Sequence, residues 1–186
     1  MMTITDKRYI ESPKVLPIRD FQQSVHEAVF LAGGISGTQN WQKETSQKLL
    51  DETALYVVNP RREGVDLAKT GHEATAQIQW EYEHLRACNF VMFWFPKETV
   101  CPIALFELGT FLGRGREIQF SEKTEQTNGQ FPWVFVGCDS EYSRRFDLEQ
   151  QISLYDPRVK LRLKLDDVIE DVSMAELEIL KKPIKR

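Results

Sequence analysis

The sequence lacks the features that mark membrane, secreted or nucleic-acid-binding proteins. No apolar run approaches the roughly 18 residues that a helix needs to cross a bilayer, and the amino end has no apolar core of the kind that secretory signals carry. The net charge is −4 and 28% of the residues are charged, a balance that offers no basic surface to nucleic acid or to an anionic membrane. We therefore expect a cytoplasmic protein that binds neither nucleic acid nor membrane.

Disulfide, metal and dinucleotide motifs are also missing. An odd number of widely spaced cysteines argues against a disulfide framework and for a reducing compartment; they are Cys88, Cys101 and Cys138. The three histidines form no H-E-x-x-H or Cys/His ligand spacing, and the chain has neither a P-loop lysine nor G-x-G-x-x-G. These absences predict a protein without a metal site or a cofactor.

What the sequence does contain is a regular alternation of strand and helix patterns. Strands are predicted at residues 28–32, 55–58, 90–95, 133–137 and 159–163, and helices at 41–51, 72–86, 102–113, 144–153 and 165–180. Such alternation predicts one α/β domain, a three-layer sandwich around a mostly parallel, flavodoxin- or Rossmann-like sheet. We place this domain at residues 28–186 and assign residues 1–27 to an N-terminal extension with at most one short strand.

The central element is the segment of residues 89–113. Its run at 90–95 is continuously apolar, which is typical of a strand buried on both faces. Pro102 suits the first turn of a following helix, and Gly113 or Gly115 is expected to end that helix. A leucine stripe at i, i+3 and i+7 would bind the helix to the sheet: Leu105, Leu108 and Leu112.

Glu107 lies off this stripe, on a mostly apolar face just past the carboxyl end of a central strand. Open parallel sheets place their ligands at such an end, so Glu107 is a candidate catalytic residue. A partly solvated helical glutamate is the alternative. Cys101 precedes the same helix, and because no histidine is near it in sequence, a packing role is favoured over a thiol nucleophile.

The helix predicted at residues 72–86 has two distinct faces. Its apolar stripe, expected to pack on the sheet, consists of Ile78, Tyr82 and Leu85. The second face collects Gln77, Trp80, Glu81 and His84. On that face an aromatic ring can stack on a nucleobase, while an amide or carboxyl group hydrogen-bonds the edge of the base. The alternative is a solvated face with the tryptophan in the core.

Two turns follow the first strands of the predicted domain. Gly33 and Gly34 allow close approach of the backbone to a ligand, or simply a tight turn toward the next helix. Asn59 opens the second turn, in which Arg61 and Arg62 can hold a carboxylate or a phosphate. Surface arginines paired with neighbouring acidic residues are the alternative.

Four segments taken together resemble the nucleoside 2-deoxyribosyltransferase family: FLAGGISG with Trp41, VVNPRR, QIQWEYEHLRACNFVMFWFP and PIALFELG. They lie in the order expected for that family, across residues 30–113. The resemblance implies that Glu107 attacks the anomeric carbon of a nucleoside and that Glu81 holds and protonates the departing base. It also implies that Gly33 and Gly34 line the sugar pocket, and that the protein is a homo-oligomer whose sites are completed across a subunit interface.

The expected substrates are a nucleoside or nucleotide and a free base. From the residue patterns and the resemblance together, the expected substrate-binding residues are Gly33, Gly34, Trp41, Asn59, Arg61, Arg62, Gln77, Trp80 and Cys101. Cys101 stands where the transferases commonly carry an aspartate, and Phe30 stands where they often carry a tyrosine. Transfer of the (deoxy)ribosyl group is the leading hypothesis. Hydrolysis, cleavage of a dinucleotide such as NAD, and nucleotide binding without catalysis are the alternatives.

Overall fold

A computed structural model describes residues 4–17, 28–62, 71–119 and 133–180 of the 186-residue chain. The strands are β1 (Tyr9–Glu11), β2 (Ala28–Gly33), β3 (Tyr56–Asn59), β4 (Phe90–Phe95), β5 (Trp133–Cys138) and β6 (Leu161–Arg162). The helices are α2 (Trp41–Glu52), α3 (His72–Ala87), α4 (Pro102–Gln119), α5 (Arg145–Tyr155) and α6 (Leu165–Leu180). Strand and helix therefore alternate from β2 onward, as the sequence predicts.

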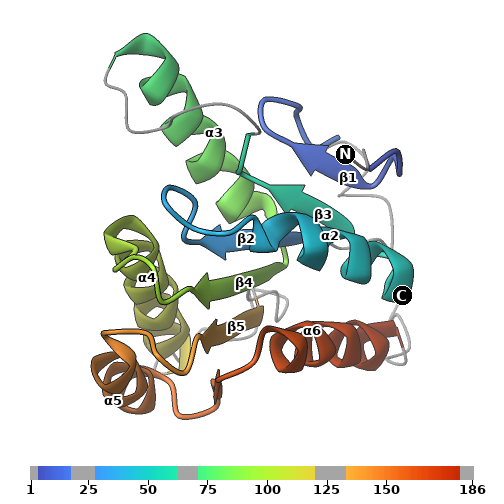
Figure 1. The fold of residues 1–186 in the computed structure, drawn as a ribbon. Helices are drawn as coiled ribbons and strands as arrows, with labels where there is room; N and C mark the ends of the chain where they lie inside the picture. The colour runs from blue at the N-terminus through green and yellow to red at the C-terminus, as the bar shows by residue number, and fades with distance from the viewer. Residues whose placement is uncertain (1–3, 18–27, 63–70, 120–132, 181–186) are drawn as a thin grey trace.

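The strands form one parallel sheet in the order β1-β3-β2-β4-β5-β6 (Figure 1). Strand β4 lies inside the sheet between β2 and β5, and all six of its residues are buried. A continuous apolar run is suited to this place because helices cover both faces of the sheet. The prediction of an α/β fold with a mostly parallel sheet is confirmed.

The helices form the two outer layers of a three-layer sandwich. Phe93 of β4 packs in a cluster with side chains of α3, α4 and α5, whereas its neighbour Met92 packs with side chains of α2 and α6. Successive residues of a strand point to opposite faces, so these two clusters are the two sides of the sheet. In Figure 1, α2 and α6 lie on one side of the sheet, and α3 and α4 lie on the other side.

The first described residues take part in this fold. Strand β1 pairs in parallel with β3 at the edge of the sheet, and Leu16, five residues after it, is completely buried. The extension thus contains the one short strand that the sequence allows, and it supplies core side chains as well. The domain boundary between residues 27 and 28 stays a prediction.

Helix α2 follows its sequence signals closely. The Asn40 side chain accepts a hydrogen bond from the backbone N–H of Lys43 at 3.2 Å and caps the helix, as predicted. Trp41, Leu49 and Leu50, the expected apolar positions, are all buried. The cap and the apolar positions together explain why this helix begins where it does.

Helix α4 begins as expected but runs further. Pro102 is its first residue, which confirms that prediction. The stop predicted at Gly113 or Gly115 is wrong, because the helix continues to Gln119. A glycine costs a helix interior only about 1 kcal/mol, and here both glycines keep the helical backbone instead of the left-handed conformation of a helix end.

Helix α3 presents a different face to the sheet from the one predicted. Ile78 is 65% exposed and Tyr82 is 60% exposed, so the predicted apolar stripe is wrong at both positions, although Leu85 is buried. The face that packs inward carries Gln77, Trp80 and His84. The large indole contributes more buried apolar area than a smaller side chain would, and the polar groups on this face all find partners.

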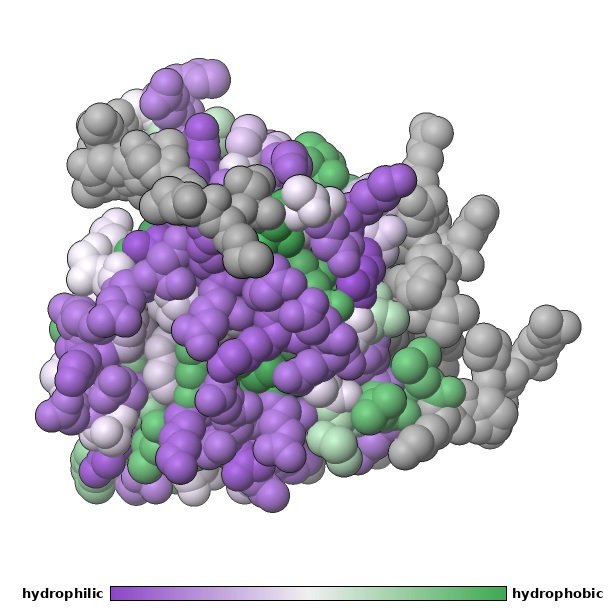
Figure 2. All heavy atoms as spheres, turned by 45° about the vertical axis from the view of Figure 1, so that its right-hand side comes forward, coloured by the Kyte–Doolittle hydropathy of each residue, from purple (hydrophilic) through white to green (hydrophobic). Residues whose placement is uncertain are grey.

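The exterior over α2 and α6 is mainly hydrophilic. Figure 2 shows this side of the molecule with only small, separate groups of hydrophobic residues among its coloured atoms. Among the helices that the structure describes, none has both the length and the apolar character required to span a bilayer.

Candidate active site

The carboxyl ends of β2 and β4 form the point where the strand order reverses. From β2 the chain passes through α2 to β3 on one side, and it then returns through α3 to β4 on the other side of β2. The two connections leave adjacent strands in opposite directions, and sheets of this kind bind their ligands outside the carboxyl ends of the strands at such a switch point. The segments at this switch point are the glycine turn after β2 and the residues between β4 and α4.

The glycine turn packs directly against the end of β4. Gly33 has a φ of +146°, and a Cβ atom added to it would lie 2.0 Å from the carbonyl oxygen of Trp94. A Cβ atom on Gly34 would lie 2.7 Å from Pro96 and 2.9 Å from the Sγ atom of Cys101. Both positions exclude a side chain, so the turn brings bare backbone to the switch point.

Trp41, the first residue of α2, fixes this turn by a hydrogen bond. Its indole Nε1 donates to the Gly34 carbonyl oxygen at 2.8 Å, and Gln42 Nε2 donates to the same oxygen at 3.0 Å. The Trp41 ring is buried in the cluster between the sheet and α2. Its observed role is therefore to position the turn, and direct contact of Trp41 with a substrate stays a prediction.

Arg61 holds the same loop from the side of β3. Its guanidinium donates from Nη1 to the Gln39 carbonyl at 2.8 Å and from Nη2 to the Thr38 carbonyl at 2.9 Å. Asn59 is buried, accepts the Arg61 backbone N–H at 2.9 Å and donates to the Tyr9 hydroxyl at 2.9 Å. Both predicted binding residues are thus occupied by protein partners that shape the rim of the site.

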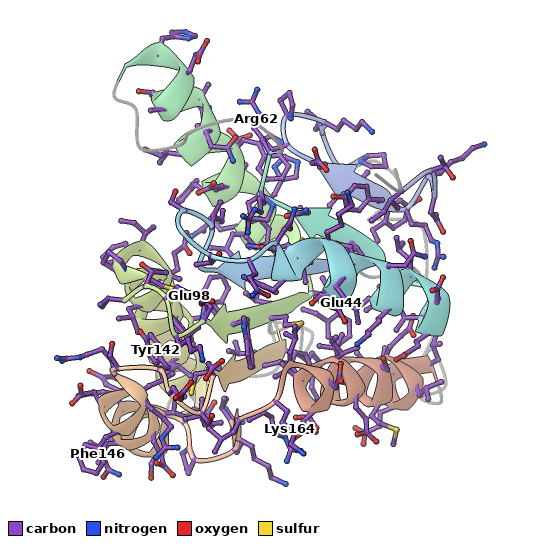
Figure 3. All side chains as sticks on the ribbon, in the orientation of Figure 1. Glu44, Arg62, Glu98, Tyr142, Phe146 and Lys164 are labelled. Carbon is purple, nitrogen blue, oxygen red and sulfur yellow. The ribbon has the colours of Figure 1, made fainter. Side chains whose placement is uncertain are left out.

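Arg62 differs from its neighbour. It is half-buried at the end of β3, close to α3, and Figure 3 labels it there. Its guanidinium takes part in none of the hydrogen bonds or ion pairs formed between described residues. The acidic residues that follow it in the chain, Glu63 and Asp66, lie outside the described residues. Binding of an anionic group by Arg62 stays a prediction.

The structure brings Glu81 of α3 and Glu107 of α4 together. Burial, and secondly the charge of Glu81, raise the pKa of Glu107 to about 7. Burial also raises the pKa of Glu81, while a hydrogen bond from Gln77 acts in the opposite direction. Two carboxyl groups that interact in a poorly solvated place do not both ionise readily, so the pair retains a proton near neutral pH.

Gln77 is fully engaged in holding Glu81. It is only 5% exposed, and its Nε2 donates to Glu81 Oε1 at 2.8 Å and to the Pro60 carbonyl at 3.0 Å. Its Oε1 accepts the Ser12 hydroxyl at 2.6 Å. The sequence offers no local signal for this contact, because Ser12 and Gln77 are 65 positions apart. Base recognition by Gln77 stays a prediction, and its observed partners are all protein groups.

Trp80 and His84 complete the inward face of α3. The Trp80 indole donates to the Lys14 carbonyl at 2.8 Å and stacks on the His84 ring, with the ring centroids 4.0 Å apart. His84 Nε2 accepts the backbone N–H of Leu16 at 3.1 Å, so the ring proton lies on Nδ1, which donates to the Trp80 carbonyl at 2.7 Å. Burial lowers the pKa of His84, which keeps the ring neutral. Stacking of a base on Trp80 stays a prediction.

Cys101 lies beside Gly34 in an unusual conformation. Its φ is +51°, a left-handed value that non-glycine residues seldom adopt, and asparagine and aspartate tolerate best among them. Burial raises the pKa of its thiol to about 11, so the sulfur stays protonated at neutral pH. The site therefore gives Cys101 no activation as a nucleophile. In the described part of the chain, no group of three or more His, Cys, Asp or Glu side chains is arranged so that it could hold a metal ion.

Comparison with known families agrees with this arrangement. A family model described as "Nucleoside 2-deoxyribosyltransferase like" matches residues 26–124, which is more than half of the 186-residue chain. The chain belongs to the nucleoside 2-deoxyribosyltransferase-like family. The matched range runs from β2 through α4 and so contains both glutamates and the glycine turn. No curated protein matches the chain. Membership of this family suggests a glycosyltransferase-like enzyme that acts on small nucleoside substrates.

Proposed function

We propose that this protein cleaves the N-glycosidic bond of a (deoxy)nucleoside or its monophosphate and transfers the (deoxy)ribosyl group to another base. The observation that carries the proposal is the electrostatically coupled pair of Glu81 and Glu107. The two glutamates come from the helices that flank β4 in the chain, α3 before it and α4 after it, within the range that the family model matches. The two members of the pair have the chemistry that the reaction requires.

In the first half-reaction the Glu107 carboxylate attacks the anomeric carbon of the sugar. A C–O ester bond forms, and the C–N bond breaks with its electron pair moving to the base. The Glu81 carboxyl donates its proton to a ring nitrogen of the departing base. A carboxylate suits this task because the sugar gains oxocarbenium character in the transition state.

In the second half-reaction a ring nitrogen of another base attacks the same carbon. The ester C–O bond breaks, which regenerates the Glu107 carboxylate, and the proton of the incoming base passes to Glu81. With water in place of the second base, the same step gives a free sugar and makes the protein a hydrolase. The two outcomes share every protein group and differ in the nucleophile that reaches the ester.

The pKa values suit a pair that shares one proton. In the free enzyme the N–H of Gln77 stabilises the ionised form of Glu81, so the proton rests mainly on Glu107. A bound nucleoside reverses this preference, because its electropositive anomeric carbon favours ionised Glu107 and the ring nitrogen of the base accepts a hydrogen bond from protonated Glu81. We expect a bell-shaped dependence of turnover on pH with its maximum near neutrality.

The accessible guanidinium of Arg62 favours a substrate with an anionic group, such as a 5′-phosphate. Arg62→Ala should raise the KM for a nucleoside monophosphate about 10-fold and leave the KM for the nucleoside unchanged. Arg61→Ala is the informative comparison, because it releases the loop at Thr38 and Gln39 and should impair both substrates alike. Equal effects of Arg62→Ala on nucleoside and monophosphate would contradict a phosphate site.

The decisive experiment is a turnover assay of purified protein with nucleosides, deoxynucleosides and their monophosphates, with and without a second base. Chromatography would follow free base and exchanged nucleoside. We expect Glu107→Gln to lower turnover on the order of 1,000-fold. Glu44→Gln is the matched control: Glu44 lies on α2 (Figure 3), its side chain is 67% exposed and pairs with Lys48, and its loss should leave turnover unchanged.

Three outcomes are distinguishable in this assay. Base exchange that disappears in Glu107→Gln supports transfer, and free base without exchange identifies a hydrolase. A folded protein that acts on no member of the panel would contradict the proposal and leave nucleotide binding as the function to test.

A further inference from the structure

We propose that Ser12 is a positioning residue for Glu81, and that the segment of residues 9–16 serves as a support for the acid side of the active site. The inference rests on the proposed function, in which Glu81 protonates the base. Ser12 lies outside the residues 26–124 that the family model matches, so family membership does not supply this role.

The segment acts on the side-chain amide of Gln77, and its hydrogen bonds leave this amide one orientation. The Pro60 carbonyl can only accept a hydrogen bond, so it must face the NH₂ group of Gln77, to which it lies at 3.0 Å. The amide oxygen then faces Ser12, whose hydroxyl donates to it at 2.6 Å. Pro60 and Ser12 thus act from opposite sides to prevent rotation of the amide by half a turn.

The fixed amide in turn distinguishes the two oxygens of Glu81. The second proton of the NH₂ group points to Glu81 Oε1 at 2.8 Å. Oε1 is therefore an acceptor whenever this contact is made, and the proton of a neutral Glu81 must sit on Oε2. An acid with its proton on a defined oxygen can be aimed at a ring nitrogen, which is the positioning that proton transfer needs.

Ser12 is itself held firmly in place. Its backbone N–H donates to the Asn59 carbonyl at 3.2 Å, one residue beyond the β1–β3 pairing of Glu11 with Asn59. After Ser12, the Lys14 carbonyl accepts the indole N–H of Trp80, and the Leu16 N–H donates to His84. The segment is thus attached to β3 before Ser12 and to α3 after it.

Among the described residues, Glu107 of α4 is the titratable group that interacts with Glu81 across the site. His84, one turn along α3, is kept neutral by burial. The groups that residues 12–16 direct at α3 are a hydroxyl, a carbonyl and a backbone N–H, none of which carries charge. A change at Ser12 therefore reaches Glu81 through the Gln77 hydrogen bond and not through a new charge.

The test compares Ser12→Ala with Ser12→Thr, which keeps the hydroxyl, and with Val15→Ala, whose side chain in the same segment points to solvent. Loss of the hydroxyl should lower kcat about 5- to 10-fold with little change in KM. The alkaline limb of the pH profile of kcat should move to higher pH, because a loosened Gln77 stabilises ionised Glu81 less. Ser12→Thr should restore both, and Val15→Ala should leave both unchanged.

A second measurement does not depend on turnover. Carbon-13 NMR of carboxyl-labelled glutamate, with the Glu81 signal assigned by its loss in Glu81→Gln, would follow the titration of Glu81 in the ligand-free protein. We expect Glu81 to titrate at higher pH in Ser12→Ala than in the parent or in Ser12→Thr. An unchanged titration would overturn the inference.

The two measurements separate this inference from the proposed function. If the parent protein transfers or releases bases and Ser12→Ala has normal kcat and normal titration, the inference fails and the function stands. If the parent acts on no nucleoside, the proposed function fails, and the titration alone decides whether Ser12 orients Glu81. A kcat that falls in step with the melting temperature, and that threonine does not restore, would show a merely structural role and overturn the inference.

Discussion

Helices α3 and α4 each bring one glutamate to the candidate active site, but different forces hold the two helices against the sheet. Among residues 102–113 of helix α4, whose side chains the structure describes, the buried ones are all apolar: Ala104, Leu108, Phe111 and Leu112. Helix α3 leaves Ile78 and Tyr82 exposed and buries Gln77, Trp80 and His84. The side of the site with the proposed nucleophile, Glu107, thus depends on packing, and the side with the proposed acid, Glu81, depends largely on directed hydrogen bonds.

This difference has a functional meaning. Apolar packing is non-directional, so it places a helix without selecting one orientation of a carboxyl group. Hydrogen bonds to Gln77 and Trp80 do select an orientation, because their donors and acceptors must align. A nucleophile can use either carboxylate oxygen, whereas an acid must present its proton from a particular one. The more polar support therefore lies on the helix that carries the proposed acid.

The largest effect is expected from breaking the apolar attachment of α4. Leu108→Ala should lower the free energy of unfolding by about 3 kcal/mol, because Leu108 is almost fully buried under the sheet. Chemical denaturation would measure the change. Phe106→Ala on the same helix is the control: Phe106 is 75% exposed, and its truncation should change stability by less than about 0.5 kcal/mol.

Breaking the polar attachment of α3 should have a somewhat smaller effect. Trp80→Phe removes the hydrogen bond to the Lys14 carbonyl and part of the stack on His84, and should cost about 2 kcal/mol. Tyr82→Phe, on the exposed face of the same helix, should cost almost nothing. Equal losses from the two variants would show that residues 12–16 contribute little to holding α3.

The raised pKa of Glu107 predicts a variant that is more stable than the parent protein. Its value rises from 4.5 to about 7 on folding, so the folded state binds more protons than the unfolded state between these pH values. The contribution of Glu107 to the free energy of unfolding is therefore fully present below about pH 4.5 and is lost as the pH rises through 7. Glu107→Gln, which cannot ionise, should stabilise the protein by about 1–2 kcal/mol at pH 9, since burial of the amide offsets part of the gain. The advantage should vanish near pH 4.5, and a gain that is the same at both pH values would contradict the assignment.

The smallest expected effect is a pH-dependent loss of stability at His84, which tests its hydrogen bond to residues 12–16. Burial lowers its pKa from 6.5, so its contribution to stability is fully present above pH 6.5 and is lost as the pH falls through the folded-state pKa. A protonated ring can no longer accept the Leu16 N–H. Denaturation at pH 7.5 and pH 5.5 should therefore show a greater fall in stability for the parent than for His84→Gln. An equal fall in both would mean that His84 does not titrate on unfolding in this range.

Much of the framework follows from local features of the sequence. The unbroken apolar run of β4, the Asn40 cap of α2 and Pro102 at the start of α4 are each explained by a few neighbouring residues. Glu107 was placed at the carboxyl end of a central strand on the same grounds, because a helix that starts after that strand must carry it there.

The missed features depend on contacts between distant residues. The apolar spacing of Ile78 and Tyr82 favoured the wrong face of α3, because it takes no account of the polar partners that residues 12–16 supply to Gln77, Trp80 and His84. The helix stop at Gly113 failed for a related reason: a glycine ends a helix only where a left-handed turn is required. Arg61 and Arg62 cannot be told apart in the sequence. In the fold, Arg61 binds the carbonyls of Thr38 and Gln39, whereas Arg62 makes no such bond to a described residue.

By itself, the sequence determined the order of strands and helices and the parallel sheet, and it predicted Glu81 and Glu107 as the catalytic pair. Helical and strand periodicities, caps and turns act over a few residues, so they can be recognised along the chain. The tertiary structure decided which face of α3 is buried, how Glu81 and Glu107 influence each other, and that Ser12 supports Gln77. Burial and hydrogen bonding between segments arise only when the chain is closed into a core, and they set the orientation and the pKa of the groups proposed to carry out the chemistry.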